Sequence, residues 1–144
     1  MILPDANVLI YAIDEGAPRH EIARQWLEDA LSGRESVGFA WTVVIAVIRI
    51  ITNGSIFTAP MTITEATARV EEWMAVPICV SVEPTQRHLS VLRGLLSPVG
   101  TAGNLVPDAH LAALAIEHGA TVASADHDFG RFPGLRWFDP LIPR

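Results

Sequence analysis

Four aspartates have the residue type and the placement for acid or metal chemistry. Asp5, Asp108, Asp126 and Asp128 come from three distant segments, and each lies where an expected strand or helix begins or ends. In open α/β sheets, ligands bind beyond the carboxyl ends of the strands. Taken singly, each aspartate could cap a helix, complement a helix dipole or lie in a solvated turn. Taken together, they predict that one fold brings at least three carboxylates to one edge of a sheet.

Clustered carboxylates repel one another, so this edge of the sheet requires a cation. Magnesium fits because it is hard, prefers oxygen ligands and keeps several waters, and manganese could substitute for it. A magnesium ion held by carboxylates suits phosphoryl chemistry, because it makes hydroxide available near neutral pH and neutralises transition-state charge. Asn7, two residues after Asp5, either orients a ligand or water or is simply a turn-forming residue. The five histidines are scattered and none pairs with another at ligand spacing, so zinc is not supported.

The basic residues exclude several classes of protein. All ten are arginines, and no lysine is present. Response-regulator receivers and haloacid-dehalogenase-type phosphatases rely on a lysine, so both are disfavoured, and no Gly-x-x-x-x-Gly-Lys loop is present to indicate a P-loop nucleotidase. The net charge of −6 argues mildly against a protein that grips nucleic acid over its whole surface. It does not argue against a nuclease that holds its substrate through bound cations. Arg19 and Arg24 are expected on a solvated helix face.

Strands and helices are expected to alternate along the whole chain. The expected strands are Ile2–Asp5, Val37–Ala40, Ile78–Val82, Thr121–Ser124 and Arg136–Phe138. The expected helices are Ala6–Ile13, Arg19–Leu31, Trp41–Thr52, Thr64–Met74 with Thr64 as its cap, Thr85–Leu96 and Leu105–His118, with a loop at Ser97–Asn104. Residues Trp41–Thr52 have strand propensity, but their length favours a buried helix. This alternation predicts a single domain over residues 1–144 with a three-layer α/β/α fold around a mostly parallel sheet.

The apolar residues bear on location and on partners. The longest apolar runs are far shorter than the roughly 20 residues that cross a bilayer, and the N-terminus lacks a basic leader, so we expect a cytoplasmic protein with no membrane contact. The mean hydropathy of +0.33 is high for a small domain. Some apolar surface is therefore expected to be covered by a partner.

Three motifs in this order resemble those of the PIN-domain family. Asp5-Ala-Asn7-Val-Leu-Ile-Tyr11 resembles the start of a PIN domain, and Gly103–Ala115 resembles its central acidic helix. Ser124–Phe129, followed by Phe132-Pro-Gly-Leu135, resembles the last acidic motif. Trp41–Asn53, with Ile56-Phe57 after it, is similar to a subgroup of VapC toxins. The resemblance runs nearly end to end.

The resemblance implies a magnesium-dependent endoribonuclease, the toxin of a toxin–antitoxin pair, which forms a homodimer and is neutralised by a VapB-like antitoxin. Its substrate would be structured RNA such as tRNA or an rRNA loop. Carried over by position, Asp5, Asp108 and Asp126 are the catalytic, metal-binding carboxylates, and Asp128 is an additional metal-site acid. Ser124 and Asn7 are supporting polar residues. Arg49, the sole charge of an apolar helix, either contacts RNA or pairs with a structural carboxylate.

One departure from the family pattern weakens the metal site. PIN domains usually have a glutamate three residues before the position of Arg49, where this chain has Ala46. Losing a ligand weakens metal affinity, so we expect at least one magnesium and do not commit to a second. The main alternative is therefore a PIN-like module that binds RNA or an antitoxin without cutting. A DNA-directed nuclease is a further alternative, but the chain has no room for the extra elements such enzymes use on duplex DNA.

Overall fold

The computed structural model describes residues 1–100 and 103–143, and its five strands form one sheet in the order β3-β2-β1-β4-β5. The strands are β1 (Ile2–Pro4), β2 (Val37–Ala40), β3 (Cys79–Val82), β4 (Thr121–Ala123) and β5 (Trp137–Phe138). The helices are α1 (Ala6–Ile13), α2 (His20–Leu31), α3 (Trp41–Ile51), α4 (Ile63–Met74), α5 (His88–Leu96) and α6 (Val106–His118). All four strand pairings are parallel, so the sheet is parallel throughout rather than mostly parallel.

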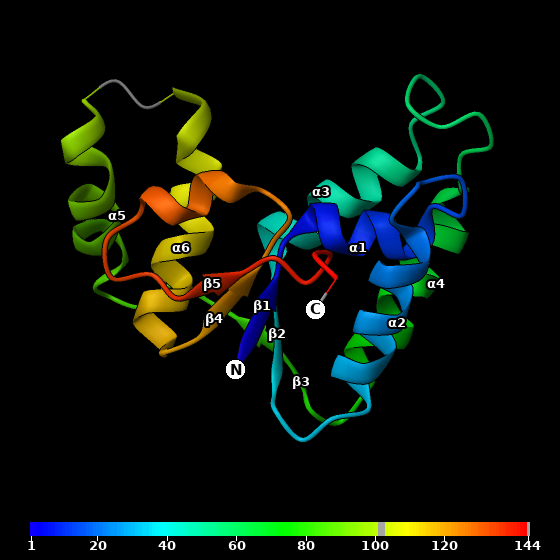
Figure 1. Cartoon of the computed structure of the whole chain (residues 1–144), viewed down its shortest axis with the longest axis horizontal. Coiled ribbons are helices and arrows are strands. Elements are labelled where there is room, and N and C mark those ends of the chain that lie inside the picture. The colour runs from blue at the N-terminus through cyan, green and yellow to red at the C-terminus, as the bar shows by residue number, and fades with distance from the viewer. Residues whose placement is uncertain (101–102, 144) are drawn as a thin grey trace.

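The helices divide between the two sides of the sheet, which confirms the three-layer α/β/α prediction. Helices α5 and α6 lie together on one side, and α1, α2, α3 and α4 lie on the other (Figure 1). This division follows from right-handed crossovers: the chain runs outward from β1 to β2 and β3, then crosses back to β4 and β5. Adjacent strands β1 and β4 therefore send the chain in opposite directions. Their carboxyl ends form the kind of switch point at which α/β folds bind ligands.

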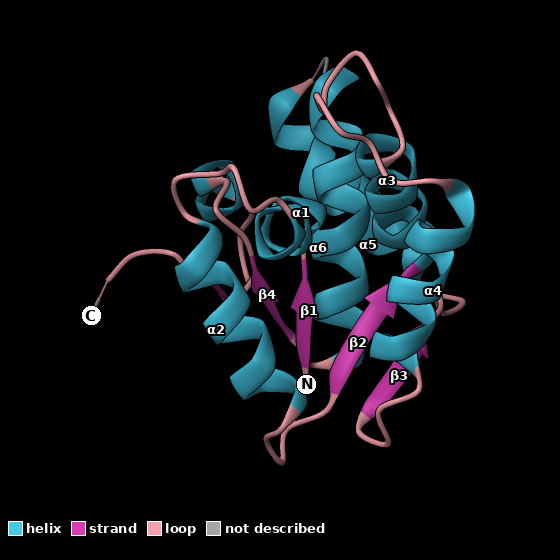
Figure 2. Ribbon diagram, turned by 90° about the vertical axis from the view of Figure 1, so that its right-hand side faces the viewer, coloured by secondary structure: helices cyan, strands magenta, loops and turns pink. Residues whose placement is uncertain are grey.

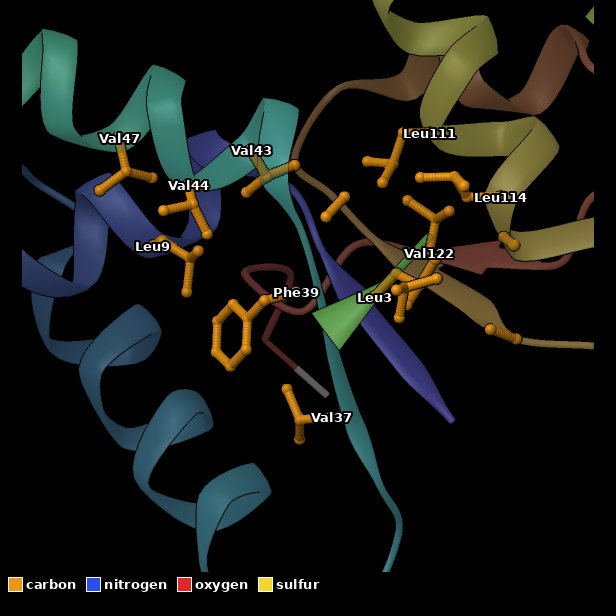
Figure 3. Close-up of a cluster of buried hydrophobic side chains, with 14 of the residues drawn as sticks. Leu3, Leu9, Val37, Phe39, Val43, Val44, Val47, Leu111, Leu114 and Val122 are labelled. Atoms are coloured by element: carbon orange, nitrogen blue, oxygen red, sulfur yellow. The ribbon is translucent and has the colours of Figure 1, made fainter. Parts of the chain in front are cut away.

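The strands read as short apolar runs because both faces of the sheet are covered. Leu3, Val37 and Val122 are completely buried, and side chains of α3 and α6 pack over the sheet from opposite sides (Figure 3). Phe39 stacks on Trp73 of α4 with ring centroids 6.3 Å apart. The apolar segment beginning at Trp41 is a helix, as its length predicted, and it buries one stripe of its surface in this core.

Gly38 marks a close approach inside the sheet. A Cβ atom built on it would lie 2.5 Å from a methyl carbon of Leu3 and 2.5 Å from one of Val82. Both neighbours are buried side chains on the flanking strands, so neither can move without disturbing the core. Glycine at this position lets β1, β2 and β3 pack at normal spacing.

Two expected helix starts were wrong. Helix α4 is capped by Thr62 rather than Thr64, because Thr62 and Glu65 form a capping box in which each side chain satisfies the other's backbone N–H. Helix α5 begins at His88 rather than Thr85, because the Thr85 backbone N–H and hydroxyl both donate to the carboxylate of Glu117 on α6. The other expected elements exist, with ends that differ by at most one residue.

The expected loop Ser97–Asn104 is partly regular. Short 3-10 turns cover Ser97–Val99 and Gly103–Leu105, and residues 101 and 102 lie outside the described part. A further 3-10 segment at His127–Arg131, which was not expected, follows β4. Within residues 1–100 and 103–143, none of the helices combines the length and the apolar character that a bilayer crossing would require.

Candidate active site

The carboxyl ends of β1 and β4 bring two of the predicted aspartates together. Asp5 directly follows β1 and caps α1 by accepting the N–H of Ala6 at 2.8 Å. The sheet ladder continues past the strand, because the Asp5 N–H donates to the Ala123 carbonyl at 2.9 Å. Asp126 follows β4 and caps the 3-10 segment after it. In Figure 2 the arrow of β1 points toward the start of α1, and β4 is parallel to β1, so both aspartates lie at one edge.

Ser124 holds this edge together. It is completely buried, and its hydroxyl donates to Asp5 at 2.7 Å. The same oxygen accepts the side-chain amide of Asn7 at 3.1 Å and the N–H of Asp126 at 3.0 Å. Asn7 also donates to Asp5 at 3.2 Å and accepts the N–H of Ala125 at 3.2 Å. The two supporting polar residues predicted from sequence thus fix the relative positions of Asp5 and Asp126.

Asp108 joins this edge from the first turn of α6. Burial, and after it the charges of Asp5, Asp126 and Asp128, together raise the pKa of Asp108 to about 6. The pKa of Asp5 is also raised, first by burial and then by Asp126, against the lowering effect of its bonds from Ser124 and Ala6. This mutual repulsion indicates that the four predicted carboxylates lie close enough to influence one another, and we call this group of four the acidic crevice.

Asp128 lies at the rim of the acidic crevice. Its N–H donates to the Asp126 carboxylate at 2.9 Å, while its own carboxylate is exposed and pairs with Arg131 at 3.2 Å. Asp128 therefore contributes charge to the crevice from a solvated position. Its predicted role as a metal ligand stays a prediction.

The donor set fits a hard cation that is held partly by water. The crevice offers carboxylate oxygens that destabilise one another, and a divalent cation would relieve that repulsion. Among the described residues, no three acidic, histidine or cysteine side chains form a ready-made metal cage. Magnesium characteristically binds through one or two carboxylates and keeps several waters, so it does not require a closed cage. Asp5, Asp108 and Asp126 are the residues that would hold it.

A second cavity opens beside the acidic crevice. Its volume is about 350 Å³, and it is lined by Asn7, Tyr11, Pro18, Arg19, Ala125 and Asp126. We call it the side pocket. Tyr11 and Arg19 were not among the residues that the sequence placed near the site. Tyr11 could have been found from its spacing, since it follows Asn7 by one helical turn, but Arg19 is brought there by a loop.

The geometry agrees with the family suggested by the motifs. The family model described as the PIN domain matches residues 2–135. The chain belongs to the PIN-domain family. Among curated PIN-family proteins, it is 47% identical to ribonuclease VapC37 of Mycobacterium tuberculosis over 97% of both chains. It is 39% identical to ribonuclease VapC33 of the same species, over 98% of this chain and 99% of that one.

Solved structures share this PIN fold at lower sequence identity. The VapBC2 complex of Rickettsia felis, bound to a promoter DNA fragment, has a chain that matches with a TM-score of 0.71 and 17% identity, covering 96% of this chain and 98% of that chain. VapC20 of Mycobacterium tuberculosis, a toxin that cleaves the sarcin–ricin loop, matches with a TM-score of 0.62 and 15% identity, covering 94% and 99% of the two chains. At this level of identity the likeness establishes the fold.

Helix α3 bears on two predictions about this PIN domain. Ala46 lies in α3, which contains no acidic residue, so this helix offers no carboxylate to a metal ion. Arg49 is exposed in the last turn of α3, and within the described residues it forms no ion pair with a carboxylate. Its predicted contact with RNA stays a prediction.

The structure brings together one pair of histidines that the sequence spacing did not indicate. His88 Nε2 lies 2.9 Å from His110 Nδ1, and the other ring nitrogen of His88 bonds to Glu117. Sequence spacing missed this pair because α5 and α6 bring together residues 22 positions apart. His110 follows Asp108 by two residues on the helix, but its ring packs against α5.

Proposed function

We propose that this PIN-domain protein is a magnesium-dependent endoribonuclease and the toxin of a toxin–antitoxin pair. The observation that carries the proposal is the acidic crevice, where Asp5, Asp126 and Asp128 raise the pKa of Asp108. The names of its relatives, ribonucleases VapC37 and VapC33, support RNA as the substrate. We further propose structured RNA, such as tRNA or an rRNA loop, as the target, which places the protein in the cytoplasm.

The crevice assigns a distinct task to each side chain. Ser124 and Asn7 hold the Asp5 carboxylate in one orientation by donating hydrogen bonds to it. Asp5 and Asp108 concentrate negative charge and would hold the cation, and Asp126 would orient the attacking water. Bound magnesium, or manganese in its place, supplies positive charge for the phosphodiester and lowers the pKa of a water. In-line attack by water on phosphorus then leaves a 5′-phosphate and a 3′-hydroxyl.

The test is cleavage of total RNA by purified variants. Asp5→Asn and Asp108→Asn are each expected to abolish cleavage, and a chelator is expected to do the same to the unmodified protein. The matched control is Asp29→Asn, because Asp29 is exposed on α2 outside the crevice. Circular dichroism checks that each variant is folded. Full cleavage by Asp108→Asn, or by the unmodified protein in chelator, contradicts the proposal.

We propose a VapB-like antitoxin and a second copy of the chain as protein partners. The antitoxin proposal is supported by solved relatives, which include complexes named VapBC from Rickettsia felis and Salmonella typhimurium.

The homodimer proposal is supported by α3, where Trp41 and Ile45, one helical turn apart, are 49% and 61% exposed. Light scattering on the purified protein tests the dimer: Ile45→Glu is expected to yield monomers, and an unmodified protein that is already monomeric refutes it.

A second candidate function is a PIN-like module that binds RNA or an antitoxin without cutting. The observation that favours it is Ala46, which leaves α3 without a carboxylate. The same RNA assay separates the two functions, because the binding module leaves RNA intact with magnesium present while still retaining it. Ala46→Glu adds a direct comparison: it is expected to increase cleavage if the missing carboxylate limits metal binding.

A further inference from the structure

The side pocket shares one wall with the acidic crevice. Asn7, Ala125 and Asp126 form that wall, and Tyr11, Pro18 and Arg19 form the rest of the lining. Its volume of about 350 Å³ lies within the range of small-ligand sites in proteins. A molecule that occupied it would therefore touch residues on which the proposed cleavage depends.

Internal hydrogen bonds fix the walls of this pocket. The Asn7 amide is held on one side by its bonds to Ser124 and Ala125. On the other side, His20 Nδ1 donates to the Tyr11 carbonyl at 2.9 Å, which ties the start of α2 to the end of α1. Tyr11 follows Asn7 by one turn of α1, so their side chains lie on the same helix face about 6 Å apart along the axis. The pocket thus has a polar end where the Asn7 side chain is fixed and an aromatic end where the backbone of Tyr11 is tied to α2.

Arg19 supplies the cationic group of the pocket. Within residues 1–100 and 103–143, no carboxylate forms an ion pair with Arg19. Its neighbour Arg24 is occupied by Glu21 and Glu28, and Arg131 near the crevice is occupied by Asp128. In a chain with a net charge of −6, an arginine left unpaired beside an acidic site is suited to an anionic group of a ligand.

We propose that the side pocket binds the nucleotide adjacent to the cleaved phosphodiester, with its base on the Tyr11 ring and its phosphate on the Arg19 guanidinium. This inference rests on the proposed RNA-cleaving function and adds a substrate class to it. A base can lie on an aromatic side chain only when it is unpaired and splayed out of a stack. The pocket therefore selects an unpaired nucleotide, and the substrate is RNA that is single-stranded at the cut.

Binding of a labelled RNA tests the proposal apart from cleavage. The probe is a short single-stranded RNA of one defined sequence with a fluorescent end, titrated in magnesium buffer with the Asp108→Asn protein, which should not cut it. Tyr11→Leu is expected to weaken binding by about tenfold, because stacking of one base contributes about 1–3 kcal/mol. Tyr11→Phe keeps the ring and is expected to bind normally. Annealing the probe to its complement is expected to remove the difference between Leu and Phe at this position.

The arginine arm of the test uses a matched control at the far end of α2. Arg19→Gln is expected to weaken binding and to reduce the slope of log affinity against log salt by about 0.7, the contribution of one phosphate contact in single-stranded nucleic acid. Arg34→Gln is expected to change neither, since Arg34 is exposed beyond the other end of the 12-residue helix. Arg19 is also exposed, so this arm stays informative even if Tyr11→Leu, which touches the core, fails to fold.

The outcomes separate this inference from the proposed function. Equal binding by Leu and Phe variants at Tyr11, an unchanged salt slope for Arg19→Gln, or no binding of the probe at all overturns the inference. If the protein with Asp108 intact cleaves RNA while Tyr11 and Arg19 have no effect on binding, the nuclease proposal stands and the pocket assignment fails. If binding depends on both residues and no cleavage occurs, the pocket assignment stands and the nuclease proposal fails.

Discussion

Replacing Asp108 with asparagine is expected to make the folded protein more stable at neutral pH when divalent cations are chelated. The pKa of Asp108 is raised from 3.8 to about 6, mainly by burial and further by Asp5, Asp126 and Asp128. Between these two pKa values the folded chain binds more protons than the unfolded chain, so stability decreases as pH rises through this window. Asparagine carries no charge, and it removes that decrease.

The size of the gain follows from the pKa shift. Each pKa unit corresponds to about 1.4 kcal/mol, so the full shift sets an upper limit of about 3 kcal/mol. Asp108 is only half-buried, and solvent screening reduces this to about 1.5 kcal/mol. Asparagine also loses a favourable interaction with the N-terminal end of α6, which costs about 0.5 kcal/mol. The net gain is about 1 kcal/mol, or a rise in Tm of about 3 °C for a domain of this size.

Urea unfolding in chelator, at about pH 7.5 and about pH 4, measures this gain. The variant and the unmodified protein should differ by about 1 kcal/mol at the higher pH and largely converge at the lower, where the carboxyl is protonated in the folded chain and partly protonated in the unfolded chain. Added magnesium should stabilise the unmodified protein more than the variant, because a cation that binds the folded state raises its stability. A variant that is less stable at pH 7.5, or a difference that does not change with pH, would refute the raised pKa of Asp108.

Other predictions concern the groups that build the site and the sheet. Ser124→Ala removes the donor to Asp5 and leaves buried partners unpaired, so it should cost about 1–3 kcal/mol by urea unfolding, and an unchanged midpoint would contradict this role. Gly38→Ala inserts a methyl group against Leu3 and Val82 and should cost about 1–3 kcal/mol in the same assay, whereas a neutral effect would mean that the strands can separate. Thr62→Ala should cost about 1 kcal/mol through the lost cap of α4, while Thr64→Ala, a control outside the cap, should have a smaller effect.

The sequence predicted the layers of the fold because each element had a local signal. Apolar runs of four or five residues marked the strands, and the length of the Trp41 segment separated a buried helix from a strand. Helix starts were less well predicted, because they depend on partners. Thr62 and Glu65 form a local capping pattern, so the start of α4 was available from the sequence. The start of α5, by contrast, depends on Glu117, which lies 32 residues from Thr85 and could not be paired with it by any local rule.

The acidic crevice was predictable for a different reason. Asp5 and Asp126 follow strands, and parallel strands bring their carboxyl ends to one edge whatever the loops do. The approach of Asp108 required only that α6 begin near that edge. The side pocket could not be predicted in this way, because the position of Arg19 depends on the loop before α2 and on the bond between His20 and the Tyr11 carbonyl. A residue placed by a loop gives no periodic signal, so the sequence predicted that Arg19 is exposed but did not predict that it lines the side pocket.

The carboxylates of the acidic crevice repel one another, but hydrogen bonds and burial hold them in place. Asp5 is held by hydrogen bonds from Ser124, Asn7 and the N–H of Ala6, and Ser124 is itself completely buried. These bonds keep the carboxylates near one another, although each ionised carboxylate makes the ionisation of its neighbours less favourable. A group retained for catalysis at the expense of stability should show opposite effects when it is removed. Asp108→Asn is therefore expected to increase stability and abolish RNA cleavage together, a combination that a purely structural aspartate would not produce.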